Sequence, residues 1–159
     1  MKWNARISRR SMLAGAGGLG AAMATGPAKA QVQSSPAAMG LAIRKITGGA
    51  TVTPGKVTLE VPPLSENGNS VAASIAVDSP MTAKDHVKAI HVLAERNPQP
   101  HVISVQLGPR AGKANISTRM RLADTQNVTA IAEMSDGTFW SDSGLVIITI
   151  GACLEDMPG

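Results

Sequence analysis

The chain has 159 residues, with 15 Lys and Arg against 11 Asp and Glu, and its calculated isoelectric point is near 9.6. Five of the cations lie within residues 1–30, which contain no acidic residue, so residues 31–159 hold ten cations and 11 acids. The basic balance therefore belongs to the N-terminal segment. The remainder lacks the excess of positive charge that nucleic-acid binding requires, and its length suits one domain with a single core.

Residues 1–30 have the three parts of an export signal. Cations in the first ten residues precede a modest apolar stretch over 12–24 and then Ala28-Lys29-Ala30, whose small-x-small form is typical of a signal-peptidase site. The pair Arg9-Arg10 lies in S-R-R-S-M-L, which matches the twin-arginine export pattern. The apolar stretch is too short and too rich in Gly to span a bilayer. We therefore expect a protein that starts near Gln31 in a bacterial periplasm, with no membrane attachment after cleavage.

Residues 31–42 are predicted to form a mobile leader, and the apolar periodicity that follows is typical of short β-strands. Over 56–61 apolar and polar residues alternate, so that Val57, Leu59 and Val61 share one face. Similar stretches, separated by turn sequences, predict further strands at 70–77, 86–93, 102–107, 113–122, 128–134, 138–140 and 144–150. Short strands at this spacing predict an all-β sandwich over 43–150.

Three details of this sandwich follow from local patterns. Ser135-Asp136-Gly137 predicts a tight hairpin, because Asp-Gly accepts positive φ. Residues 82–96 also fit a short helix, since Thr82 and Asp85 have the spacing of an N-cap and an acid at N3. The stretch 144–150 is apolar at successive positions, which predicts burial on both of its faces.

Cys153 is the single cysteine of the chain, so it cannot form a disulfide within the chain. In an exported protein an odd cysteine indicates pairing with another molecule or a thiol kept for reaction, and a disulfide-linked homodimer is one form of such pairing. The alternative is an inert thiol that packs as a small apolar side chain. Cys153 follows Gly151-Ala152 after the last apolar stretch. A thiol on such a terminal arm can enter a pocket of another protein, which favours a functional role.

The other residue types that carry chemistry form no recognisable set. His86, His91 and His101 lack the spacing of metal ligands, and no cysteine or acid completes a site with them. Four of the eight methionines lie before residue 40, and the rest are scattered as in an ordinary core. No G-x-S-x-G motif or phosphate-binding loop is present. The sequence therefore predicts neither a metal site nor a bound cofactor.

Seven stretches extend in order across nearly all of the chain after the signal: I-T-G-G-A-T-V (46–52), P-P-L-S-E-N-G-N-S-V (62–71), V-D-S-P-M-T (77–82), I-H-V-L-A-E-R-N-P-Q-P (90–100), L-G-P-R-A-G-K-A (107–114), S-T-R-M-R-L-A-D-T-Q (117–126) and A-E-M-S-D-G-T-F-W (132–140). Together they resemble the SoxY family, the sulfur-carrier subunits of the periplasmic sulfur-oxidising (Sox) system. The twin-arginine signal is a further point of similarity.

The resemblance implies an immunoglobulin-like antiparallel β-sandwich that pairs with SoxZ, a second small β protein, as a heterodimer. It also implies that Cys153, on a C-terminal arm over 151–159, holds the sulfur substrate covalently. In such a cycle a c-type cytochrome joins the thiol oxidatively to thiosulfate, and a sulfate-releasing hydrolase and a sulfane dehydrogenase act on the adduct. The protein would then be a substrate carrier without enzymatic turnover of its own.

The tail departs from the family pattern around the cysteine. Carriers of that family end in G-G-C-G-G, whereas this chain has Gly151-Ala152-Cys153-Leu154-Glu155. Side chains in place of glycine reduce the conformational freedom and the slimness of the arm. Glu155 and the following acid add negative charge, which disfavours the thiolate and repels anionic thiosulfate.

Three hypotheses follow from the sequence. The first is a periplasmic carrier of sulfur intermediates that uses Cys153. The second is a SoxY-like binding protein that keeps the fold and the pairing surface and has lost efficient carrier activity. The third is a thiol oxidoreductase, which lacks a second cysteine in the chain to resolve a mixed disulfide.

Overall fold

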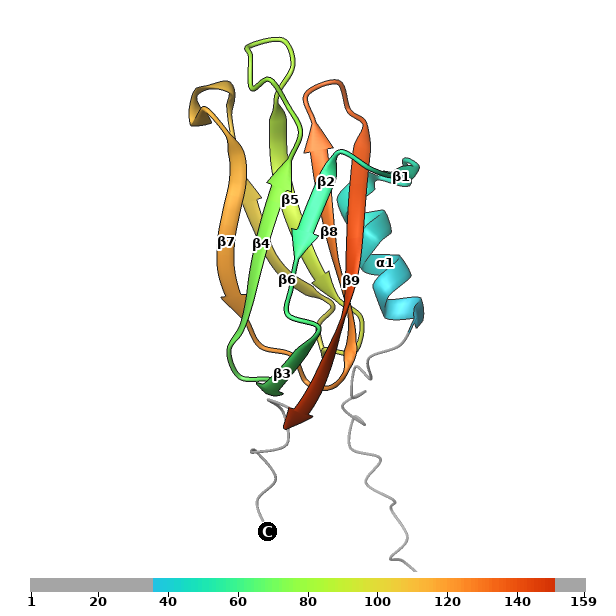
Figure 1. Ribbon diagram of the computed structural model, residues 1–159. Helices are drawn as coiled ribbons and strands as arrows, with labels where there is room; N and C mark the ends of the chain where they lie inside the picture. Colours follow the sequence, from blue (N-terminus) through green and yellow to red (C-terminus); the bar gives the residue numbers. More distant parts are fainter. Residues whose placement is uncertain (1–35, 151–159) are drawn as a thin grey trace, which may run out of the picture. The chain divides into compact units, whose positions relative to one another are not determined.

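The computed structural model describes residues 36–150, which form two facing β-sheets and one helix (Figure 1). The elements are α1 (Pro36–Thr47), β1 (Val52–Pro54), β2 (Val57–Glu60), β3 (Leu64–Asn67), β4 (Val71–Val77), β5 (Val87–Ala94), β6 (His101–Gln106), the 3-10 turn η1 (Pro109–Ala111), β7 (Ala114–Met120), β8 (Gln126–Met134) and β9 (Phe139–Ile150). The predicted all-β sandwich is therefore confirmed. Within these residues no helix is long and apolar enough to cross a membrane.

The larger sheet has the strand order β1-β9-β8-β5-β6, and β3 joins it by pairing with β9. The smaller sheet has the order β2-β4-β7. Neighbouring strands are antiparallel in both sheets except at β9, where β1 pairs in parallel with its first residues and β3 with its last. β9 is 12 residues long, which leaves room for β1 to pair with its first residues and β3 with its last.

The core between the sheets follows the predicted alternation. In β4, Val71, Ala73, Ile75 and Val77 are buried while the intervening residues are more exposed. Val57 is likewise buried in β2, and the neighbouring Leu59 and Val61 pack against the core at partly buried positions. Of the four described methionines, Met81, Met120 and Met134 are buried in the same core and Met39 packs against the apolar cluster of Leu93, Ile131 and Phe139, which agrees with a packing role.

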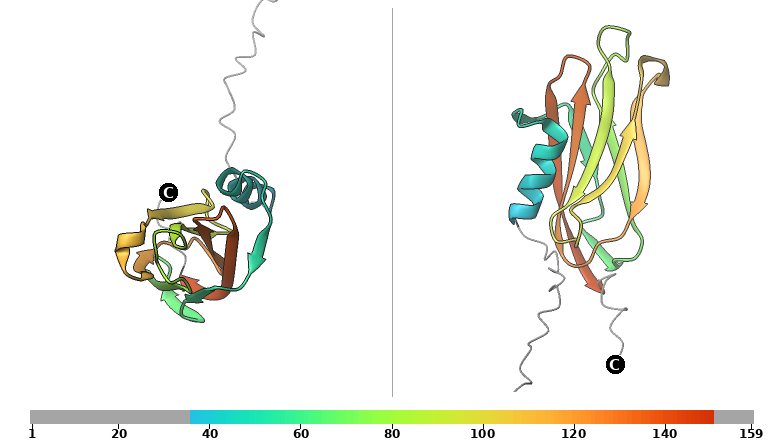
Figure 2. Two further views of the ribbon diagram at one scale, coloured as in Figure 1. Left: turned by 90° about the horizontal axis from the view of Figure 1, so that it is seen from above. Right: turned by 180° about the vertical axis from the view of Figure 1, so that it is seen from behind.

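The predicted leader over 31–42 is wrong from residue 36 onward, because α1 begins at Pro36. Its apolar residues pack on the outer face of the larger sheet, against Leu93, Ile131 and Phe139 from three neighbouring strands. Figures 1 and 2 show the helix lying alongside β8 and β9. The sequence does carry helix signals. Pro36 stands at the first position, Gly48 has φ +63 just after the last, and apolar residues recur at helical spacing: Met39, Ala42, Ile43 and Ile46.

The alternative helix over 82–96 is not observed, since residues Val87–Ala94 form β5. All but one residue of this strand is buried, because the facing sheet covers one side and α1 covers part of the other. The strand predicted at 86–93 is therefore confirmed. The Thr82 hydroxyl does accept a hydrogen bond from the Asp85 N–H at 3.0 Å, as an N-cap residue would, but the chain continues as a strand and not as a helix.

The predicted hairpin joins β8 to β9 through Ser135-Asp136-Gly137, where Gly137 has φ +84. The Asp136 carboxylate accepts hydrogen bonds from the Thr138 backbone N–H, at 2.9 Å, and from the Thr138 hydroxyl, at 2.7 Å. These bonds hold the pKa of Asp136 below its usual value, the hydroxyl bond contributing most. The local bonds close the turn that starts β9 in register.

The expected burial of both faces of 144–150 is also wrong. Val146 and Ile148 point into the core, whereas Leu145 is 54% exposed and Ile147 is 46% exposed on the outer face. Sequence periodicity could not separate a strand buried on two sides from one that leaves an apolar face open, because both have the same residue types.

Two contacts bring β9 close to the segment that begins with β2. The Leu59 N–H donates to the Asp142 carboxylate at 2.8 Å, which links an edge strand of the smaller sheet to β9. Gly144 lies so near Val61 that a Cβ added at 144 would be 2.8 Å from the Val61 Cγ2. The absence of a side chain at Gly144 therefore allows Val61, in the segment between β2 and β3, to lie close against β9.

We expect Gly144→Ala to lower the stability of the fold by about 1–3 kcal/mol, because the new methyl group has to displace Val61 or β9. In thermal unfolding this corresponds to a fall in Tm of several degrees. Gly108→Ala is the matched control, since a Cβ at 108 meets no atom within 4 Å. Equal Tm values for the two variants would show that the close approach at Gly144 has no energetic importance.

Candidate functional site: the base of the C-terminal arm

The residues predicted to carry the chemistry, Gly151, Ala152 and Cys153, lie outside the described residues. Ile150, the last residue of β9, immediately precedes them in the chain. The structure therefore describes the base from which the predicted arm starts, and the geometry of that base decides how firmly the start of the arm is held.

On one side, β3 and the turn after it hold the end of β9. The Ile147 N–H donates to the Pro63 carbonyl at 3.0 Å, and the Gly68 N–H donates to the Ile150 carbonyl at 2.8 Å. Between these two bonds the Thr149 hydroxyl donates to the Glu66 carbonyl at 3.0 Å. The β9 backbone is thus bonded up to its last described residue.

On the other side of β9, the hydroxyl of Thr125 makes backbone hydrogen bonds beyond the point where the pairing with β8 ends. The pairing of β8 with β9 ends at Gln126 opposite Val146. Beyond it, the Ile148 N–H donates to the Thr125 hydroxyl at 3.0 Å, and that hydroxyl donates to the Ile148 carbonyl at 3.3 Å. Thr125 therefore takes the place of a strand partner for Ile148.

These bonds connect to the loops at the same end of the sandwich. Gly68, which donates to Ile150, accepts a hydrogen bond from the Leu122 N–H at 2.8 Å. The loop that contains Leu122 also includes Asp124, whose carboxylate pairs with the Arg96 guanidinium at 3.1 Å. The arm base is therefore part of a connected end of the sandwich, with side chains of both charge signs around it.

Exposed apolar side chains surround the arm base. Leu64 on β3 is directly opposite Ile147 on β9, and the two are 55% and 46% exposed. Leu145 and Ile150 on β9 are also more than half exposed. Ile150 has the strand parity of the core-facing Val146 and Ile148. Leu64, Leu145 and Ile147 instead share the outer face, and we call these three residues the β3–β9 apolar patch. Contiguous apolar side chains open to solvent are typical of surfaces that bind a partner.

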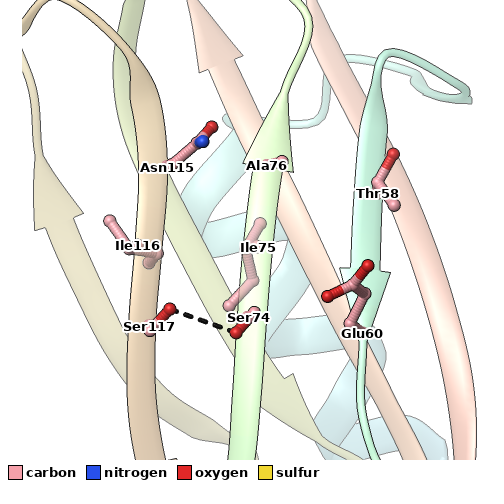
Figure 3. Close-up of a pocket in the computed structure, with 8 residues that line it drawn as sticks. All are labelled: Thr58, Glu60, Ser74, Ile75, Ala76, Asn115, Ile116 and Ser117. Atoms are coloured by element: carbon pink, nitrogen blue, oxygen red, sulfur yellow. Dashed lines mark hydrogen bonds between the residues drawn. The ribbon is translucent and has the colours of Figure 1, made fainter.

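A shallow pocket lies on the outer face of the smaller sheet. It has a volume of about 290 Å³. Figure 3 shows Glu60, Ser74 and Ser117 side by side across its three strands. The hydroxyls of Ser74 and Ser117 are 3.1 Å apart. Glu60 is the one ionisable side chain that lines it, so the surface lacks the paired groups that catalysis would need.

Within residues 36–150, no three His, Cys, Asp or Glu side chains come together in an arrangement that could hold a metal ion. The predicted site residues of the arm lie outside this range. For the site, the structure therefore describes only the hydrogen bonds that hold the end of β9, from which the arm starts. Sequence reasoning did not identify that support, because Thr125 and Pro63 acquire their roles only through pairing between distant segments.

Comparison with protein families matches residues 43–153 to the family described as sulfur oxidation protein SoxY. The matched range includes all of the described strands and ends at Cys153. No curated protein matches the chain in sequence.

Among solved structures, the chain is similar to the sulfur carrier protein SoxY from Chlorobium limicola f thiosulfatophilum, with 26% identity and a TM-score of 0.62. That match covers 73% of this chain and 100% of the other, and it confirms the immunoglobulin-like sandwich. A superoxide reductase (neelaredoxin) from Ignicoccus hospitalis is 13% identical with a TM-score of 0.53, over 59% of this chain and 80% of the other. A likeness at this identity concerns the fold alone.

We expect Thr125→Val to loosen the end of β9, because the Ile148 N–H loses its acceptor while the size of the side chain is nearly kept. Loss of one such bond should speed amide hydrogen exchange at Ile148 by about tenfold. Thr118→Val is the control, since the Thr118 hydroxyl makes one weak bond, to the Arg119 carbonyl at 3.4 Å. Unchanged exchange at Ile148 in Thr125→Val would mean that Thr125 does not hold the arm base.

Proposed function

The chain belongs to the sulfur oxidation protein SoxY family, and on that premise we propose that it is a periplasmic carrier that holds sulfur intermediates covalently on Cys153. The observation that carries the proposal is the extent of the family match, which reaches Cys153, three positions after the last residue of β9. A carrier needs a reactive group near a firm support, and the hydrogen bonds around Ile150 supply that support.

The loading step joins two sulfur atoms by oxidation. The Cys153 thiol loses its proton to solvent, and the thiolate bonds to the outer sulfur of thiosulfate to give R–S–S–SO₃⁻. Two electrons leave and pass to an oxidant, for which we propose a c-type cytochrome partner. A hydrolase then adds water and breaks the bond to the SO₃ group, so that sulfate leaves and a persulfide, R–S–S⁻, stays on Cys153. A sulfane dehydrogenase would act on that persulfide.

The distance along the arm limits where this chemistry can occur. Three extended residues span about 10 Å, so the Cys153 thiol cannot travel far from Ile150. Enzymes that act on the adduct must therefore approach the end of the sandwich formed by β3, β9 and the adjoining loops. This favours a carrier that is recognised by its body and presents its thiol at one fixed end.

We further propose a SoxZ-like subunit as the partner of a heterodimer. The β3–β9 apolar patch supports this proposal, because it is an exposed surface of Leu and Ile beside the arm base. A partner seated there would also lie next to Cys153. The twin-arginine signal suits such a pair, since that route exports folded proteins and could carry a partner that has no signal of its own.

The second candidate function is a SoxY-like binding protein that has lost efficient loading. The observation that favours it is the pair Leu154-Glu155, which stands where carriers of the family have two glycines. Side chains at these positions restrict entry of the arm into a narrow pocket, and the negative charge opposes an anionic substrate.

Incubation of the purified chain with a SoxZ-like subunit, an oxidising c-type cytochrome and thiosulfate should add the mass of the S–SO₃ group to the peptide that contains Cys153. Cys153→Ser should show no addition, because the hydroxyl is a far weaker nucleophile than a thiolate. Replacement of Leu154 and Glu155 by Gly should speed the addition. If the unaltered chain gains no mass while the double-Gly variant does, the binding-protein alternative is correct.

Ile147→Lys should weaken association with the SoxZ-like subunit by at least about tenfold, because it places a charge in the centre of the β3–β9 apolar patch. Thr58→Lys is the control, since it introduces the same charge at an exposed position of the smaller sheet. Analytical ultracentrifugation of the mixed proteins measures the effect. Equal weakening by both variants would indicate that the added charge acts through overall electrostatics and would rule out the patch as the pairing surface.

A further inference from the structure

Two histidines and a serine form a hydrogen-bonded cluster on the outer face of the larger sheet, beside α1. His91 on β5 is the register partner of Ser104 on β6, and its Nδ1 lies 2.6 Å from the Ser104 hydroxyl oxygen. On the other side of the same hydroxyl, the Nε2 atom of His101 lies at 2.7 Å. The pairing of β5 with β6 therefore brings together residues that the sequence separates.

The cluster lines a cavity of about 490 Å³ between the helix and the sheet. The helix wall consists of Ala42, Lys45 and Ile46. The opposite wall consists of His91, Gln99, His101 and Ser104. One wall is thus mainly apolar with a single cation, and the other is made of hydrogen-bonding groups, which is the mixture found in small-molecule sites.

His91 is only 8% exposed, and its Nε2 atom is buried without a hydrogen-bond partner among the described residues. Buried side-chain nitrogens in native proteins nearly always have a partner. The Ser104 hydroxyl has one proton and two lone pairs, so at least one of the two imidazoles must donate to it. When His101 donates and His91 accepts at Nδ1, the His91 Nε2 carries an N–H that is free to donate.

The charges around the cavity favour an anion. Lys45 from α1 is the one permanently charged side chain in its lining, which contains no Asp or Glu. The nearest acidic influence on His91 is Glu133 of β8, and this carboxylate pairs with the Lys88 ammonium. Burial lowers the pKa of His91, the charge of Glu133 opposes that shift, and His101 lowers the pKa further.

We propose that this cavity binds a small organic anion, whose acidic group accepts hydrogen bonds from the histidine cluster next to Lys45 and whose apolar part lies on Ala42 and Ile46. Two imidazoles and a serine hydroxyl are too few ligands for a stable metal site, whereas imidazole N–H, hydroxyl and ammonium groups together bind carboxylates and sulfonates well. The site lies on α1, β5 and β6, apart from the arm base, and the proposal does not depend on the chemistry of Cys153.

The test is a titration of the full chain carrying Cys153→Ser, which excludes disulfide formation, with butane-1-sulfonate and butanoate as probes. Two-dimensional ¹H–¹⁵N NMR should show shifts at the backbone amides of α1 and β6 and at the ring nitrogens of His91 and His101. Inorganic sulfate supplies the anionic group without an apolar chain, and butan-1-ol supplies the same apolar chain without a negative charge. Both should bind at least about threefold more weakly than butane-1-sulfonate, because sulfate lacks the apolar chain that would contact the helix wall and butan-1-ol lacks the negative charge that the other groups would bind.

Affinity for butane-1-sulfonate should rise as the pH falls through the lowered pKa of His91, because a bound anion favours the protonated form of that imidazole. Lys45→Met should weaken binding by about threefold, and His91→Gln should reduce the pH dependence of binding, because it removes the buried imidazole. Lys113→Gln, at an exposed lysine next to η1, is the control. Circular dichroism establishes that each variant is folded.

Three results would overturn the proposal. The first is an absence of shifts at α1 and β6 with every probe at millimolar concentration. The second is equal weakening by Lys45→Met and Lys113→Gln, which would indicate non-specific attraction. The third is binding of sulfate as tight as that of butane-1-sulfonate, which would reduce the site to an ion-binding surface. Loading of Cys153 with sulfur could succeed or fail in each of these cases, so the two proposals are tested separately.

Discussion

The structure depends on the pairing of β9 along its whole length. This strand is bonded to β8 over most of its residues, and it accepts β1 at its start and β3 at its end. Where β8 stops, the Thr125 hydroxyl takes over as a partner of Ile148. One side of the strand is therefore bonded up to Ile148 and the other up to Ile150, so the last described residue of β9 is held in place.

This arrangement separates two kinds of surface. The end of the sandwich around Ile150 combines a firm backbone with exposed apolar side chains, which suits docking of another protein near a short arm. The middle of the larger sheet is instead covered partly by α1, which leaves an open cavity over β5 and β6. The helix thus contributes to stability through its contacts with Ile131 and its neighbours and also forms one wall of the proposed anion site.

The sequence predicted those parts of the fold in which one face of a strand is buried and the other is exposed. β2, β4 and β7 show this alternation clearly, and the β8–β9 turn is specified by Asp136-Gly137. The strand predicted at 86–93 is confirmed as β5, although burial on both of its sides removes the alternation. Prediction failed for the stretch 144–150 of β9, because its run of apolar residues predicts two buried faces while no described segment covers the outer one. The helix at Pro36 was missed although its end signals are present. For the candidate site, the position of Cys153 came from the sequence and from resemblance, whereas Thr125, Ser104 and the β3–β9 apolar patch required the strand pairing.

The central claim, that Cys153 carries sulfur in the periplasm, is tested most directly by the intact mass of the protein recovered from the periplasm of cells that are oxidising thiosulfate. We predict a chain that starts near Gln31 and carries added sulfur, which a reducing agent removes and which is absent from cells grown without a reduced sulfur compound. A chain that retains its first 30 residues, or a processed chain whose thiol stays unmodified during active thiosulfate oxidation, would contradict the account.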